Sequence, residues 1–85
     1  MQITITRRGV AFDLIDKDDA AIEAVQQTFA AADLFDWKAL GMHEIANSRY
    51  QVIFNRKHSH HDREAFAGRL VFELRQRGIA AKVVA

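Results

Sequence analysis

Residues 49–55 have the sequence RYQVIFN, in which two kinds of side chain alternate. Tyr50, Val52 and Phe54 fall on one side of an extended chain, and the residues between them fall on the other. This period of two predicts a β-strand whose aromatic side faces the core. We therefore expect the strand to lie in a sheet that helices cover on that side.

Two hairpins are predicted from the same alternation. Met42–Ala46 precedes the strand across a two-residue Asn-Ser turn, so these two segments are expected to pair. The segments 2–6 and 10–14 alternate in the same way before and after Gly9. Gly9 is expected to supply the positive φ angle that a tight hairpin loop needs.

Two helices are predicted from apolar spacings of three and four residues. The first follows the acidic run at 16–19, whose carboxylates can cap it, and carries an apolar stripe over residues 22–32. The second begins at Ser59, which fits a capping box with Asp62. It ends before Gly78, because glycine is suited to the left-handed position that follows a helix.

The predicted element order is β-β-α-β-β-α-β, with residues 79–84 as the last strand. Eighty-five residues with 49% apolar and 27% charged side chains suit one globular domain, residues 1–85. The pattern resembles a ferredoxin-like α+β sandwich with an extra N-terminal strand. This resemblance implies a mostly antiparallel sheet with two helices on one face. It indicates no particular function, because such folds serve many.

Composition excludes several classes of protein. The chain has no cysteine, which excludes disulfide scaffolds and thiolate metal sites. It has no apolar stretch of membrane-spanning length, and residues 1–9 alternate unlike a secretory signal, so a cytoplasmic protein is expected. It also has no phosphate-binding loop, dinucleotide glycine pattern or nucleophile elbow. We therefore expect no enzyme activity and no cofactor.

The near-zero net charge of +1 conceals a division between the two halves of the chain. Residues 1–45 contain four basic and eight acidic residues, and residues 46–85 contain eight basic and three acidic residues. The halves therefore carry −4 and +5. Such asymmetry suggests an anionic partner for the basic half.

The densest basic segment is residues 55–63, NRKHSHHDR, which leads into the second predicted helix. Free N–H groups at a helix N-terminus and flanking cations favour an anion, either a nucleic-acid phosphate or an acidic protein surface. The alternative is a solvated loop in which Ser59 and Asp62 only cap the helix.

The same segment contains a histidine cluster. His60 and Glu64 are four residues apart and would share a helix face, a spacing that permits bidentate metal capture. However, the run reproduces no established zinc spacing, so no metal site is predicted. A histidine-cluster metal-binding protein is kept as an alternative.

Two further features suggest protein contacts. Phe35 and Trp37 follow the first helix, where large aromatic side chains either cover the core or anchor an interface. The uncharged segment 2–6 could pair with a second copy or with a partner chain if it forms a sheet edge.

The leading hypothesis is a small non-enzymatic protein that docks on a macromolecular partner, with protein as the expected partner class. One example would be a phage or mobile-element inhibitor of a nucleic-acid-handling complex. The first alternative is direct nucleic-acid binding through the basic residues from Arg56 to Arg63. The residues predicted to contact a partner are Arg49, Arg56, Lys57, His58, His60, Arg63, Asp16, Asp18, Asp19, Asp36 and Trp37.

Overall fold

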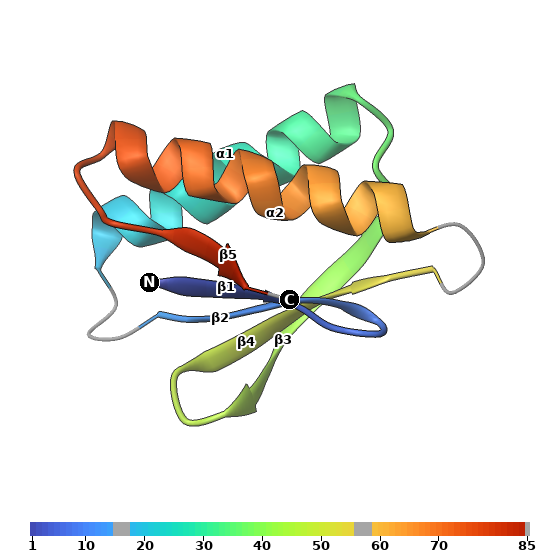
Figure 1. Cartoon of the computed structure of the whole chain (residues 1–85), viewed down its shortest axis with the longest axis horizontal. Helices are drawn as coiled ribbons and strands as arrows, with labels where there is room; N and C mark the ends of the chain where they lie inside the picture. Colours follow the sequence, from blue (N-terminus) through green and yellow to red (C-terminus); the bar gives the residue numbers. More distant parts are fainter. Residues whose placement is uncertain (15–17, 56–58, 85) are drawn as a thin grey trace.

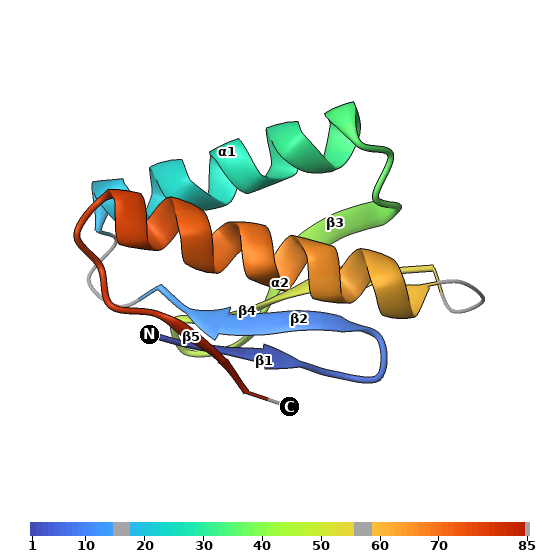
Figure 2. The ribbon, with the colours of Figure 1, turned by 45° about the horizontal axis from the view of Figure 1, so that its top comes forward.

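The computed structural model describes residues 1–14, 18–55 and 59–84. Its elements follow the predicted order (Figure 1). They are β1 (Gln2–Ile5), β2 (Gly9–Asp13), α1 (Asp19–Leu34), β3 (Ala39–Ala46), β4 (Arg49–Phe54), α2 (Ser59–Gln76) and β5 (Lys82–Val84). The five strands form one mixed sheet, and both helices lie on the same face of it (Figure 2). The predicted α+β class is confirmed.

The strand order is β3-β4-β2-β1-β5, which differs from the ferredoxin-like prediction. In that arrangement β2 and β5 would be neighbours, because they begin and end the split β-α-β-β-α-β unit. Here β1 lies between them, antiparallel to β2 and parallel to β5. The extra strand is therefore inserted into the sheet and is not added to its side.

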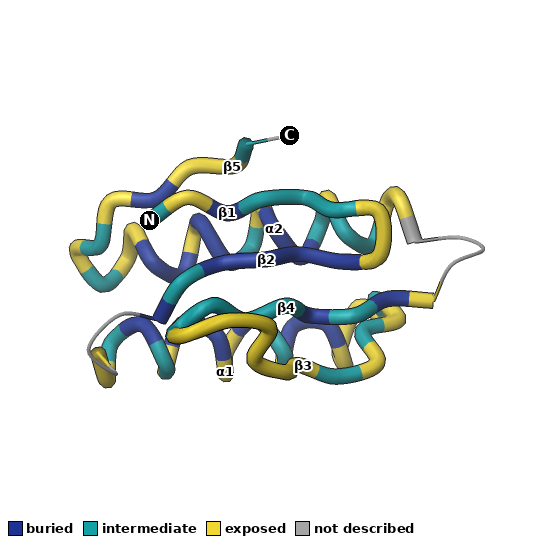
Figure 3. Tube along the Cα trace, turned by 90° about the horizontal axis from the view of Figure 1, so that it is seen from below, coloured by how far each residue is buried: buried dark blue, intermediate teal, exposed yellow. Residues whose placement is uncertain are grey.

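The prediction that the first strand might form a sheet edge is wrong for the same reason. Both sides of β1 are paired, so its backbone offers no free edge to another chain. The edges are β5, which is three residues long, and β3, which is eight residues long. Most of β3 is exposed, as the yellow tube of Figure 3 shows.

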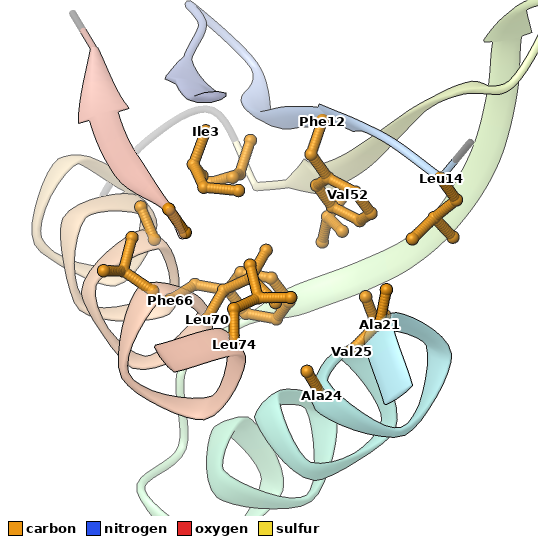
Figure 4. Packing of buried hydrophobic residues seen from close by; sticks show 14 of the residues in the cluster. Ile3, Phe12, Leu14, Ala21, Ala24, Val25, Val52, Phe66, Leu70 and Leu74 are labelled. Carbon is orange, nitrogen blue, oxygen red and sulfur yellow. The ribbon is translucent and has the colours of Figure 1, made fainter. Parts of the chain in front are cut away.

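The core lies between the sheet and the two helices. Phe66, Leu70 and Leu74 of α2 are fully buried against the sheet, near Ile3 of β1 and Phe12 of β2 (Figure 4). Four alanines of α1 are also buried, and their small side chains let the helix approach its neighbours closely. The predicted inward face of β4 is confirmed, since Val52 and Phe54 are buried and Tyr50 is partly buried.

Local sequence signals mark the start of α1, the β3–β4 turn and the end of α2 at the predicted positions. The carboxylate of Asp18 accepts a hydrogen bond of 2.9 Å from the Ala20 N–H and caps α1. Ser48 has a φ of 63° in the β3–β4 turn, and Gly78 has a φ of 77° just after α2. Gly78 therefore occupies the left-handed conformation that favours glycine. The last strand is shorter than predicted, because pairing with β1 covers only Lys82–Val84.

Gly9 has a different role from the one predicted. It is not among the residues with positive φ, and it lies inside β2 opposite Ile53 of β4. A Cβ atom on Gly9 would overlap the carbonyl oxygen of Val52. Gly9 is therefore required because two strands approach too closely for a side chain, and the turn conformation does not demand it.

Two glycine substitutions should have opposite effects on stability. Gly9→Ala is expected to lower the free energy of unfolding by about 2 to 3 kcal/mol, because the added methyl must push β2 away from β4. Gly68→Ala adds a methyl in open space on α2 and should raise stability by about 0.5 to 1 kcal/mol. Urea unfolding followed by circular dichroism measures both, and equal effects of the two variants would contradict this assignment.

Candidate functional site

The centre of the predicted basic loop falls outside the described residues. Arg56, Lys57 and His58 are not described, and the same holds for Asp16 before α1. The anion site predicted at the start of α2 therefore stays a prediction. The structure does place the remaining predicted contact residues.

Arg49 and Arg63 both bind other parts of the chain. Arg49 lies opposite Asp13 in the β2–β4 register, and its Nη1 is 3.3 Å from the Asp13 carboxylate. The Arg63 guanidinium donates a hydrogen bond to the backbone carbonyl of Thr6. The first contact joins two strands, and the second joins α2 to the β1–β2 connection.

Asp62 contacts the residue that precedes β3. It was predicted to reach back in a capping box with Ser59, whose side chain lies outside the description. The structure shows that the Oδ2 atom of Asp62 accepts a 3.0 Å hydrogen bond from the Lys38 N–H. The carboxylate thus connects the start of α2 to the segment that leads into β3.

The acidic candidates are at the two ends of α1. Asp18 caps the helix, and Asp19 lies exposed in its first turn. Beyond the other end, Asp36 accepts a 2.8 Å hydrogen bond from the Lys38 Nζ atom. This hydrogen bond and the charge of Asp36 raise the pKa of Lys38 above its ordinary value. Asp36 is therefore already paired within the chain.

The histidine cluster shows one contact between exposed side chains. His60 Nε2 lies 3.1 Å from Glu64 Oε1, at the predicted spacing of four residues. Within residues 1–14, 18–55 and 59–84, no group of three or more histidine or acidic side chains could hold a metal ion. Among the described members of the cluster, His60 and Glu64 thus form a surface pair.

The ion pairs around Glu73 include one contact that joins the acidic half of the chain to the basic half. Glu73 of α2 is buried, and its carboxylate accepts hydrogen bonds of 2.8 Å from Arg69 Nε and 3.0 Å from Arg77 Nη1. Arg77 also reaches across to Glu23 of α1 at 3.2 Å. Burial opposes the ionisation of Glu73, but the hydrogen bonds from Arg77 and Arg69 outweigh it and lower its pKa.

The segment 34–45 is the most apolar part of the described surface. It contains five of the seven large apolar side chains that are exposed there. These five are Leu34, Phe35, Leu40, Met42 and Ile45. The sequence pattern pointed to Trp37 and Phe35 but not to the other four side chains. The available signal was Leu40, Met42 and Ile45 in a strand that lacks a regular apolar alternation.

Phe35 and Trp37 stack on each other but differ in how far they are buried. Their rings stack at 5.6 Å with an angle of 28° between the planes. Trp37 is partly buried and packs against the core, whereas Phe35 is 55% exposed. Trp37 therefore covers the core and holds Phe35 in place at the surface.

An apolar groove of about 460 Å³ lies next to this segment. Ile22, Val25 and Phe29 of α1 form one wall, and Met42 of β3 and Tyr50 of β4 form the other. The β3–β4 hairpin extends away from α1, toward the lower part of Figure 1. The outer wall belongs to β3, which is an edge strand, so the groove is accessible from the side.

Comparisons with protein-family models, with curated proteins and with solved structures give no match to this chain. No helix among the described residues is long and apolar enough to cross a membrane.

The Glu73 network predicts a loss of stability in acid. Because its folded-state pKa is lowered, Glu73 contributes stability above its ordinary pKa and loses it as the pH falls through the lowered value. Glu73→Gln should lower the free energy of unfolding by about 1 to 2 kcal/mol at neutral pH, and this deficit should shrink in acid.

Thermal unfolding from pH 7 down to about pH 2 tests this expectation. Glu64→Gln is the matched control, since Glu64 is an exposed carboxylate on the same helix. A Glu73→Gln deficit that persisted unchanged at the acid end would contradict the assignment.

Proposed function

We propose that this protein is a non-enzymatic binding protein that docks on a protein partner through the segment 34–45. The observation that carries the proposal is the concentration of exposed apolar side chains along this segment. Single exposed apolar residues are ordinary on protein surfaces, but a group of them along one stretch marks an interaction site.

The chemistry of the segment favours a protein over a nucleic acid. Leu34, Phe35 and Leu40 are between 55% and 77% exposed, and apolar and aromatic side chains form the centre of protein interfaces. The flanking carboxylate of Asp33 would repel phosphates. Direct nucleic-acid binding through the basic loop is the competing hypothesis, and the capture experiment distinguishes the two. That the protein inhibits a nucleic-acid-handling complex stays a prediction.

The test uses two matched substitutions, Phe35→Asp and Phe72→Asp. The two phenylalanines are 55% and 51% exposed, but Phe72 lies on α2 and stacks with Arg69, away from the segment 34–45. The untagged protein is immobilised and used to capture partners from lysate, with and without nuclease. Phe35→Asp should reduce capture by about tenfold or more, and Phe72→Asp should leave it unchanged.

Three results would count against the proposal. Equal capture by Phe35→Asp and the unmodified protein would remove the segment from the interface. Equal loss in both variants would place the interface elsewhere or indicate general damage. Capture that disappears with nuclease would favour nucleic acid as the partner.

A further inference from the structure

The edge strand β3 and the groove beside it form one continuous site. β3 pairs with β4 on one side only, and no described strand pairs with its other side. Its register is regular from Gly41 to Glu44, between two irregularities. An edge of this kind can accept a further strand, whose backbone would bond to β3 and whose alternate side chains would face the helices.

The groove would receive these helix-facing side chains. Met42 lies opposite Val52, which is buried, so Met42 is on the helix side of the sheet. The wall opposite is Ile22, Val25 and Phe29 of α1. Polar groups in the lining are few, and a volume of about 460 Å³ suits two medium-sized apolar side chains.

Acidic residues continue the α1 stripe that lines the groove in both directions, and one more lies on β3. Asp19 and Asp33 follow the spacing of three and four residues that includes Ile22 and Phe29, so they lie on the same helix stripe. Glu44 lies opposite Tyr50, on the helix side of β3. None of the ion pairs among the described residues includes these three carboxylates.

The distance between Asp19 and Asp33 sets the spacing of basic residues that a bound segment would need. Asp19 and Asp33 are fourteen helical residues apart, which is about 21 Å at 1.5 Å per residue. Six residues of an extended strand span about 20 Å. A strand beside β3 with basic residues six positions apart could therefore place one cation at each end of the groove.

We propose that the groove binds an extended segment of a protein partner by strand addition to β3, with two alternate apolar side chains between two lysines or arginines. The pattern is basic-x-apolar-x-apolar-x-basic. The two apolar side chains enter the groove, and the basic side chains meet Asp33 at one end and Asp19 and Glu44 at the other. This inference rests on the proposed protein-binding function and adds the chemistry of the bound segment.

The experiment titrates the full chain with four acetylated and amidated heptapeptides. The probe is KTVTVTK, and its controls are ETVTVTE, KTSTSTK and a KTVTVTK peptide methylated on alternate backbone nitrogens. Binding is followed by fluorescence anisotropy and by the amide shifts of the protein in nuclear magnetic resonance spectra. The probe should bind at least about tenfold more tightly than each control and shift the amides of residues 39–46.

Three protein variants locate the site. Met42→Lys and the double variant Asp19→Asn, Asp33→Asn should each weaken binding of the probe by about tenfold or more. Phe72→Asp, on the outer side of α2, is the control and should bind as the unmodified chain does. Circular dichroism spectra of all variants verify that each remains folded.

Several outcomes overturn the inference. Equal affinity for the lysine and glutamate peptides, or amide shifts confined to residues outside β3, β4 and α1, rejects the groove. Concentration-dependent shifts of β3 without peptide assign the edge to a second copy. If the probe does not bind while Phe35→Asp still abolishes partner capture, strand addition fails and the protein-binding function stands. If the probe does not bind and Phe35→Asp also leaves partner capture unchanged, both strand addition to β3 and protein binding through the segment 34–45 are rejected.

Discussion

The fold depends on the packing of Phe66. This buried side chain of α2 makes edge-to-face contacts with Phe29 of α1 at 5.2 Å and with Phe54 of β4 at 5.5 Å. One ring therefore joins both helices to the sheet, and large aromatic contacts of this kind contribute both buried area and a preferred geometry. Because α2 covers the middle of the sheet, α1 is held chiefly along its contact with α2, including the Glu23–Arg77 pair. The opposite side of α1 faces β3 and β4. The groove lies between this side of the helix and the two strands as a result.

The sequence predicted those features that depend on neighbouring residues. The order of the elements follows from the periods of two and of three to four, which are local properties. The inward side of β4, the cap at Asp18 and the left-handed Gly78 also depend on residues within a few positions of one another. The division of charge between the two halves was also visible in the sequence. The sequence did not show which charged side chains pair with each other in the fold.

The features that depend on distant residues could not be predicted in the same way. The insertion of β1 between β2 and β5 requires knowing which strands meet, and no local pattern encodes this. Gly9 looks like a turn residue until the Val52 carbonyl is placed beside it. The hydrogen bond between Asp62 and the Lys38 N–H likewise joins residues that are 24 positions apart in the sequence. The candidate site shows the same limit, because the groove joins side chains of α1 to side chains of β3 and β4. Alternation could not reveal the exposed β3 residues, since irregular pairing at both ends of that strand disturbs the period.

The parallel pairing of β1 with β5 has a consequence for how the chain is made. The first strand leaves the ribosome long before the last one, and the Met1 carbonyl accepts a hydrogen bond from the Lys82 N–H. Until residues 82–84 emerge, β1 can pair only with β2, and one of its sides lacks its native neighbour. The sheet is therefore completed only after residues 82–84 have been made, and until then the nascent chain exposes an uncharged strand edge that chaperones or neighbouring chains could engage.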